Sequence, residues 1–483
     1  MYLKKELYKF FVVFCLLGLF GNTVTALGAE ATTDEVLVPA PEPTLPASYY
    51  EPIQTDAITD WPQGPVVYAE AAIVMDADTG TILYGKNIEA QKYPASITKI
   101  MTTLLAIEHS DPSERVIFSD HAIWGIERNS SHIGIRIGEN LSMKDCLYGM
   151  MLASANEVCL AVAEHIAGDV DTFVAMMNQK AIELGCTNTN FTNPNGLPDE
   201  NHYVSAHDMA LISRAAFQND LFREVSSSKT YKIGWTNLTG EDRWLGNHHK
   251  MLWDDSPNYY EGCLGGKTGF TQAALNTLVT YANRDGRNLI CVLLRTNGSQ
   301  QTYQDTAALL DYGFQNFHNV AVPDNKKANY GAYLLPFPAT LLDCYSTATR
   351  LDLIRNTLAS LPNYASSEHL AVHTTLEDTL IKRDLIYNDY LVGEDNIRKP
   401  EGIVNRYFLP STDYPNRNIV ASTATNSTII ETTVTNHSPI AAFNELPSWK
   451  YPLLGFLVML LIIIAIKIAF FAKRVKKKKK RAH

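Results

Sequence analysis

The alternation of apolar and polar positions predicts strands at both ends of a first large domain, with helices between them. Two short strand candidates at 71–76 and 81–84 flank Ala77-Asp78-Thr79-Gly80, whose Asp and Gly are typical of a hairpin turn. Residues 264–281 and 288–294 also have strand character, and residues 302–317 predict a closing helix. This order predicts an α/β (α+β) fold, in which the two chain ends pair in one sheet beside helices.

Two segments of the middle have helical periodicity. One begins near Ser96 and has apolar positions at helical spacing, namely Ile97, Ile100, Met101, Leu104 and Leu105. The other covers residues 141–167 and is interrupted at Ser154-Ala155-Asn156. Polar side chains therefore stand at the start of one helix and at the junction of two others.

Composition divides the rest of the chain into further segments. Residues 30–63 are acidic and Pro-rich, which predicts a flexible lead-in to a domain at 64–320. Residues 325–415 alternate short apolar runs with polar turns, which predicts a smaller, mainly β domain. Residues 416–448, rich in Ser, Thr and Asn, predict a stalk.

Both ends of the chain have the features of membrane-targeting segments. Three lysines precede an apolar stretch and small residues follow it, so residues 1–29 are expected to be a secretory signal peptide, or alternatively an uncleaved anchor. Residues 450–472, apolar except at the ends and at Lys467, predict a transmembrane helix. The tail, residues 473–483, has eight basic side chains and no acid, which indicates a cytoplasmic end. We expect a single-pass cell-membrane protein whose first large domain is extracytoplasmic, with membrane lipids as partners of the span.

Charge and cysteine usage exclude other classes. The formal net charge is −10 despite the basic tail, so the body of the chain is strongly acidic and a poor candidate for binding nucleic acid. The seven cysteines form no CxxC pair, and no disulfide is predicted. His202 and His248-His249 lack the His-Glu-x-x-His frame of a metallopeptidase, so we expect no metal and no cofactor.

Three short motifs have the residue types for acyl transfer. In Ser96-Ile97-Thr98-Lys99, positions i and i+3 share a helix face, so the Lys99 amine can act as the base that activates the Ser96 hydroxyl. Ser154 and Asn156 can relay a proton and hold a substrate amide. Lys267-Thr268-Gly269 offers a positive charge, a hydroxyl and a position where a substrate backbone can approach closely. Each motif alone also fits a simpler interpretation: helix N-caps at Ser96 and Ser154, and a surface turn at Lys267.

Together, the order and spacing of these motifs are those of the penicillin-binding protein and serine β-lactamase superfamily. In detail, residues 65–320 resemble the D-alanyl-D-alanine carboxypeptidases among the low-molecular-mass penicillin-binding proteins, peptidase family S11. The resemblance rests on Pro94–Thr102, Asn193–Asp199 with His202-Tyr203, Ala206–Ala210 and Leu309–Phe314. It implies the penicillin-binding-protein transpeptidase fold, followed by a β-rich second domain.

The resemblance also implies a role for each matching residue. Ser96 would be acylated by the penultimate D-alanine of a peptidoglycan pentapeptide, with Lys99 as base and Ser154 and Asn156 assisting. Lys267 and Thr268, beside Gly269, would receive the terminal carboxylate. The backbone N–H groups of Ser96 and Phe270 would bind the oxyanion. β-Lactams would be covalent inhibitors. Arg295, after the last strand, is a further candidate for the carboxylate end.

Other functions remain open at this point. A β-lactamase shares the three motifs, although no Glu-x-x-Leu-Asn lies between Ser154 and Lys267 to activate a deacylating water. A transpeptidase or an endopeptidase would differ only in pocket shape. A non-catalytic wall-binding scaffold would not need a nucleophile with its base, which favours an enzyme.

Overall fold

The computed structural model describes residues 45–127, 129–322, 358–376 and 380–398. All described residues belong to the first of the two units of the chain, Met1–Pro415. The predicted signal peptide (1–29), stalk (416–448), transmembrane helix (450–472) and basic tail (473–483) lie outside the described residues. Within the described part, no helix combines the length and apolar character needed to cross a bilayer.

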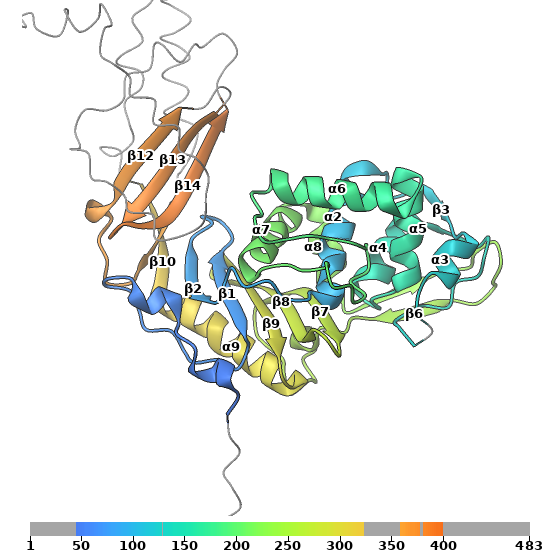
Figure 1. Ribbon diagram of the computed structural model, residues 1–483, viewed down its shortest axis with the longest axis horizontal. Coiled ribbons are helices and arrows are strands. Elements are labelled where there is room, and N and C mark those ends of the chain that lie inside the picture. Colours follow the sequence, from blue (N-terminus) through green and yellow to red (C-terminus); the bar gives the residue numbers. More distant parts are fainter. Residues whose placement is uncertain (1–44, 128, 323–357, 377–379, 399–483) are drawn as a thin grey trace, which may run out of the picture. The chain divides into compact units, whose positions relative to one another are not determined.

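The first domain is built on a five-stranded antiparallel sheet in the order β2-β1-β9-β8-β7 (Figure 1). The first strand pairs with the last, with Ala71 opposite Leu294, so the two ends of the domain meet as predicted. The segment 264–281, predicted as continuous strand, is divided by a turn at residues 272–274. The strands are β1 (Ala71–Asp76), β2 (Ile82–Lys86), β7 (Cys263–Thr271), β8 (Leu275–Arg284) and β9 (Arg287–Thr296).

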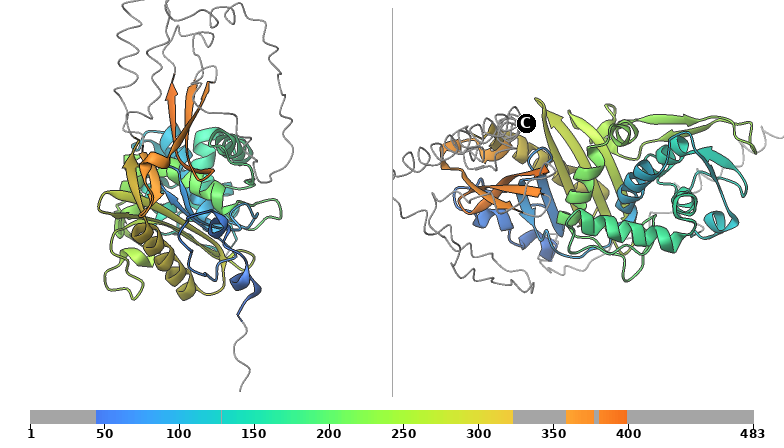
Figure 2. Two further views of the ribbon diagram at one scale, coloured as in Figure 1. Left: turned by 90° about the vertical axis from the view of Figure 1, so that its left-hand side faces the viewer. Right: turned by 90° about the horizontal axis from the view of Figure 1, so that it is seen from above.

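Helices cover both faces of this sheet (Figures 1 and 2). In β1, Ile73 and Met75 pack into one core with the middle helices, whereas Ala72 and Val74 pack into a second core with α9. The sequences of the central strands are therefore continuously apolar, because neither face of the sheet is exposed to solvent. The helices are α2 (Lys99–His109), α3 (Asp120–Trp124), α4 (Met143–Met151), α5 (Asn156–Ala167), α6 (Val170–Glu183), α7 (Ala206–Phe217), α8 (Asp220–Ser227) and α9 (Ser299–Asn316).

Two short antiparallel strand pairs complete the first domain. They are β3 (Arg115–Ile117) with β4 (Asn140–Ser142), and β5 (Thr230–Ile233) with β6 (Arg243–Gly246). Buried Glu139 joins them, because it forms an ion pair with Arg243 at 2.8 Å and accepts a hydrogen bond from the Thr236 hydroxyl at 2.7 Å.

The lead-in to the domain is ordered further upstream than its composition predicts. Residues 45–63 contain two 3-10 turns, η1 (Ala47–Tyr50) and η2 (Gln54–Ala57). Trp61 is only 4% exposed, and its indole N–H donates to the Leu83 carbonyl at 2.9 Å. Burial of this aromatic ring outweighs the Pro-rich composition, so the prediction of a flexible segment is wrong for residues 45–63.

Strands predominate among the described residues after α9. β10 (Phe317–Ala321) pairs with β11 (Leu358–Pro362), and β12 (Ala371–Leu376), β13 (Leu380–Tyr387) and β14 (Tyr390–Arg398) form an antiparallel sheet. Because β10 follows α9 directly, the first strand of this region begins before the predicted boundary near 320.

Candidate active site

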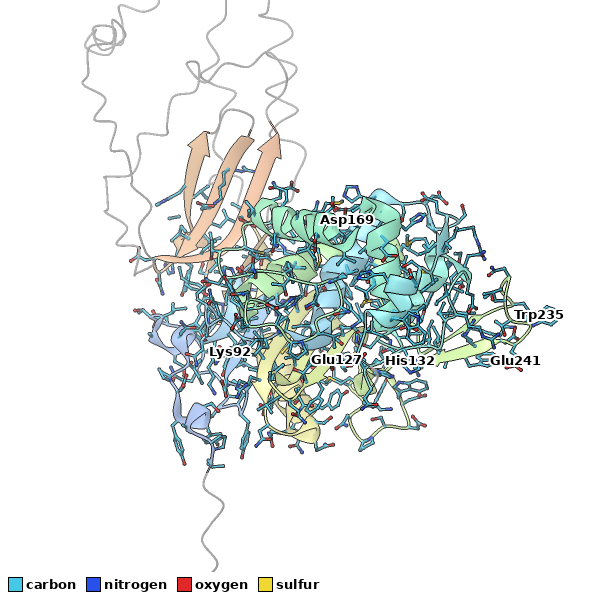
Figure 3. The ribbon with its side chains drawn as sticks, turned by 45° about the vertical axis from the view of Figure 1, so that its right-hand side comes forward. Lys92, Glu127, His132, Asp169, Trp235 and Glu241 are labelled. Carbon is cyan, nitrogen blue, oxygen red and sulfur yellow. The ribbon has the colours of Figure 1, made fainter. Side chains whose placement is uncertain are left out.

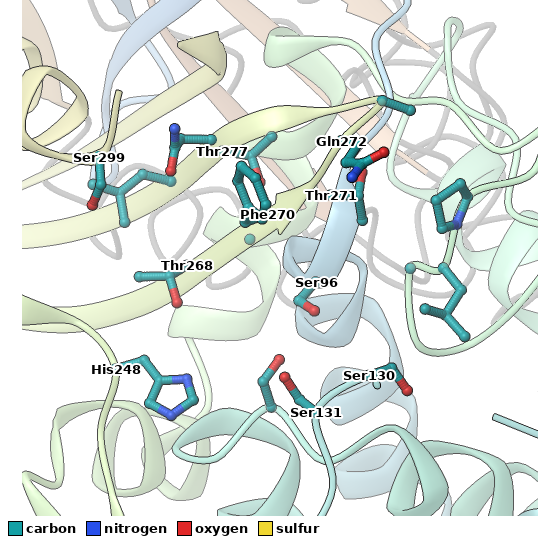
Figure 4. Close-up of a pocket in the computed structure, with 18 of the residues that line it drawn as sticks. Ser96, Ser130, Ser131, His248, Thr268, Phe270, Thr271, Gln272, Thr277 and Ser299 are labelled. Atoms are coloured by element: carbon teal, nitrogen blue, oxygen red, sulfur yellow. The ribbon is translucent and has the colours of Figure 1, made fainter. Parts of the chain in front are cut away.

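A cleft of about 930 Å³ lies along β7, the edge strand of the main sheet. Its other walls come from the 3-10 turn before α2 (Ala95–Thr98), the α4–α5 junction, Glu127 with residues 129–131, and the loop 196–198. Figure 4 shows Ser96 between Thr268 and Phe270 on one wall and Ser130 and Ser131 on the other. Six predicted site residues line the cleft: Ser96, Ser154, Asn156, Thr268, Gly269 and Phe270. Lys99 and Lys267 are buried beneath it.

The backbone before the nucleophile candidate is held in a rare conformation. Ala95 has a φ of 50°, a left-handed value that a residue with a Cβ seldom adopts. Gly196 approaches so closely that a Cβ there would lie 1.9 Å from the Ala95 carbonyl oxygen. The Thr277 hydroxyl donates to the Pro94 carbonyl at 2.8 Å. Neighbouring elements therefore hold the turn that presents Ser96, as is common where strain serves a site.

Lys99 has the contacts that a neutral amine needs to act as a base. Its side chain is 0% exposed, and Nζ donates to the Asn156 Oδ1 at 2.7 Å and to the Asn195 carbonyl at 2.6 Å. The third position of Nζ faces the Ser96 Oγ at 3.0 Å. A neutral amine has two N–H groups and one lone pair, so these two acceptors leave the lone pair for the serine proton. Burial lowers the pKa of Lys99, which favours the neutral form.

The lowered pKa sets the expected pH dependence of acylation. The neutral amine is the active form, so the rate of Ser96 acylation should rise with pH through the pKa of Lys99 and then level off. Because burial lowers that pKa, the plateau should be reached below the ordinary lysine value of 10.5. Stopped-flow acylation by a chromogenic β-lactam across the pH range measures this rise in rate. A rise whose midpoint lies at pH 10.5 or above would contradict a lowered pKa for Lys99.

Ser154 and Asn156 stand where α4 gives way to α5. Ser154 has a φ of 59° and is 4% exposed, and Asn156 is the first residue of α5. The residue in the N-cap position is Ala155, so the simpler interpretation of Ser154 as the helix cap does not hold. The Asn156 amide is oriented by Lys99, as described above, and both side chains reach the cleft.

Lys267 lies below the wall of the cleft rather than in its lining. It is 1% exposed, and Nζ donates to the carbonyl oxygen of Thr268 at 2.8 Å. Burial lowers the pKa of Lys267 well below its usual value. Thr268 is therefore the residue of this motif whose side chain faces the cleft directly.

Gly269 allows β7 to pass close to the nucleophile. A Cβ at this position would lie 2.4 Å from the Thr277 Oγ1 and 2.9 Å from the Ser96 backbone nitrogen. Phe270, the next residue, is 63% exposed at the rim of the cleft. Its backbone N–H belongs to the strand that runs beside Ser96.

Sequence analysis did not assign several residues that support the site. His202 bonds through Nε2 to the Thr98 hydroxyl at 2.9 Å and accepts from the Thr192 N–H at 3.1 Å. Glu157, buried beside Asn156, accepts from the Ile133 N–H at 2.7 Å and so fixes the loop that continues from the cleft wall. These partners lie 24 or more residues apart or in irregular loops, so no local spacing indicated them.

His202 makes stability depend on pH. Burial lowers the pKa of His202 from 6.5 to about 4, so the unfolded chain binds a proton more readily than the folded one between these values. The folded state therefore has its full stability above pH 6.5. As the pH falls toward 4, the free energy of unfolding decreases by about 3 kcal/mol. Denaturant unfolding should show a smaller decrease between about pH 7 and about pH 4 for His202→Gln than for the wild type. Equal decreases would contradict this.

Two other candidates lie outside the lining of the cleft. The Arg295 guanidinium forms an ion pair with Glu70 at 2.9 Å, and Arg295 does not line the cleft. Glu89, His207 and Asp208 are close enough together to be considered as cation ligands. However, Asp208 already accepts hydrogen bonds from the Asn188 N–H and the Thr189 hydroxyl, and His207 bonds to Glu89 at 2.9 Å. We assign no metal to this group.

The sheet with helices on both faces, and the cleft beside its edge strand, define the penicillin-binding-protein fold. The structure matches the crystal structure of penicillin binding protein 6B from Escherichia coli with a TM-score of 0.53 and 26% identity, over 71% of this chain and 98% of that one. The predicted α/β fold of the first domain is therefore confirmed.

Sequence comparison gives the family. Residues 59–298 match the family model described as D-alanyl-D-alanine carboxypeptidase. The chain is 34% identical over 258 residues to the D-alanyl-D-alanine carboxypeptidase DacB2 of Mycobacterium tuberculosis, covering 52% of this chain and 84% of that one. It is also 34% identical over 254 residues to DacF of Bacillus subtilis, of which it spans 63%. The chain belongs to the D-alanyl-D-alanine carboxypeptidase family, as its motifs predict.

Proposed function

We propose that this protein is a serine-type D-Ala-D-Ala carboxypeptidase that removes the terminal D-alanine from peptidoglycan stem peptides through an acyl-enzyme on Ser96. The observation that carries the proposal is the placement of the Lys99 amine, with two hydrogen-bond acceptors behind it and the Ser96 hydroxyl in front at 3.0 Å. Relatives named for this activity support it.

Acylation follows from these contacts. The Ser96 Oγ attacks the carbonyl carbon of the penultimate D-alanine while its proton passes to the Lys99 Nζ. The negative charge that develops on the carbonyl oxygen is received by the backbone N–H groups of Ser96 and Phe270. Lys99 then protonates the departing amine, with Ser154 relaying the proton, and free D-alanine leaves. Water hydrolyses the ester and restores the Ser96 hydroxyl.

The substrate backbone has a natural place beside β7. As the edge strand, β7 pairs on one side with β8 and leaves its other edge toward the cleft. An extended peptide can add to such an edge by main-chain hydrogen bonds. The Asn156 amide would hold the peptide from the opposite wall, and Thr268 would donate to the terminal carboxylate, with buried Lys267 behind it.

A β-lactam would acylate the same serine as a covalent inhibitor. Rapid release of the product, as in a β-lactamase, needs a group that activates water. Among the described residues that line the cleft, Glu127 is the one carboxylic acid, and it belongs to the loop before Ser130. The carboxypeptidase relatives favour a long-lived adduct over β-lactamase activity.

We further propose a single-pass cell-membrane location with the catalytic domain outside the cytoplasm. The support is the sequence: the signal at 1–29, the apolar segment 450–472 and the basic tail 473–483. A chain truncated after residue 449 should appear in the culture medium, whereas the full chain should sediment with membranes. Sedimentation of both would contradict an anchor at 450–472.

The activity is tested with the full-length protein in detergent and a synthetic pentapeptide that ends in D-Ala-D-Ala. The wild type should release one D-alanine per peptide, and Ser96→Ala should release none. Release of D-alanine by Ser96→Ala at the wild-type rate would contradict the proposal.

A further inference from the structure

The cleft has opposite charges near its two ends, with Ser96 between them. Lys250 lies beside α9, because its backbone N–H donates to the Tyr303 hydroxyl at 3.3 Å. Glu127 lies at the other end, because its carbonyl accepts from the Ser130 N–H at 3.0 Å and from the Ser130 hydroxyl at 2.7 Å. In Figure 4, Ser299 at the start of α9 and Ser130 stand on opposite sides of Ser96.

Both charged side chains are available to a ligand. Glu127 and Lys250 are exposed, and both line the cleft. Within the described ranges, no ion pair engages either of them. Figure 3 labels Glu127. A charge that borders a substrate cleft without a protein partner can select a ligand of opposite charge.

The proposed function sets the direction of the peptide between these charges. Its terminal carboxylate belongs beside Thr268, which lies on the Ser299 side of Ser96 (Figure 4). That end also contains Lys250 and the first turn of α9, which has no acidic residue, so its charge suits a carboxylate. The peptide preceding the scissile bond must therefore run the other way, past Gln272 and Ser130 toward Glu127.

We propose that Glu127 binds a primary ammonium group on the side chain of the residue that precedes D-Ala-D-Ala. This inference rests on the proposed function and names its substrate class: stem peptides whose diamino acid has a free amine. That residue is one position before the acylated D-alanine, a backbone distance of about 3.5 Å, and a lysine-like side chain extends further toward Glu127. An amine that is acylated, as in a cross-link, has no charge for Glu127.

The test compares two tripeptides, Nα-acetyl-Lys-D-Ala-D-Ala and its Nε-acetyl derivative, with the full-length protein in detergent. The wild type should cleave the free-amine peptide with a kcat/KM about 5-fold higher, the range of a partly exposed ion pair. Glu127→Gln should lower that ratio to about 1 by slowing the free-amine peptide only. Glu241→Gln, which removes an exposed acid of the β5–β6 hairpin, should keep the wild-type ratio.

Salt gives a second readout, because a surface ion pair weakens at high ionic strength. The wild-type ratio should fall as salt is added, and the Glu127→Gln ratio should not change. The proposal is overturned if the wild type shows no preference, if Glu127→Gln keeps the preference, or if it slows both peptides equally. Absence of D-alanine release from both peptides would instead refute the proposed function, so the two failures are distinguishable.

Discussion

Replacing Lys99 by arginine is expected to lower the rate of Ser96 acylation by about 10³-fold or more, the range of a positioned general base. Arginine remains protonated at any pH the protein tolerates, so it cannot accept the serine proton. It still has hydrogen-bond donors for the Asn156 Oδ1 and the Asn195 carbonyl, the two acceptors that Lys99 now uses. The change therefore removes the base and leaves donors for both acceptors.

Stopped-flow acylation by a chromogenic β-lactam measures this loss, and thermal unfolding reports whether Lys99→Arg is folded. Lys144→Arg is a matched control, because Lys144 is a surface lysine that pairs with Glu224. It should acylate at the wild-type rate. Near-normal labelling of folded Lys99→Arg would contradict the assignment of Lys99 as the base.

Gly269→Ala is the second change with a large expected effect. The new methyl group would stand 2.4 Å from the Thr277 Oγ1 and 2.9 Å from the Ser96 nitrogen, so β7 or the Ser96 turn must move. Such a shift displaces the N–H groups proposed to bind the oxyanion. Losing one such donor costs about 10²–10³ in kcat, so D-alanine release should fall by about that factor.

A matched glycine separates this effect from a general cost of substitution. Gly246 lies in β6, has no atom within 4 Å of an added Cβ, and does not have a positive φ. Gly246→Ala should therefore retain wild-type activity. If Gly269→Ala also retains it, the close approach of β7 to Ser96 is not required for catalysis.

Local spacing predicted the parts of the site that one element presents. The contact between Lys99 and Ser96 follows from their i, i+3 positions, and the structure has it. The break at residues 154–156 predicted the α4–α5 junction, and the pairing of β1 with β9 followed from strands at the two ends of the domain.

Long-range partners could not be predicted in this way. The Asn195 carbonyl that orients Lys99, and Thr277, which holds the Pro94 carbonyl, are separated from these partners by 96 and 183 positions. The burial of Lys267 beneath the cleft could not be predicted either. The alternation of side chains between the two faces of a strand does not distinguish a side chain in a cleft from one beneath it. Burial of Trp61 depends on Phe317 and Tyr390, and its Pro-rich surroundings indicated a linker.

The most direct test of the account is the intact mass of the full-length protein after incubation with benzylpenicillin, followed by peptide mapping. We expect one lasting penicilloyl adduct on Ser96, no adduct on Ser96→Ala, and release of D-alanine from a D-Ala-D-Ala peptide by the untreated enzyme. Rapid penicillin turnover without a lasting adduct would favour a β-lactamase. An adduct on another residue, or neither adduct nor D-alanine, would contradict Ser96 as the nucleophile.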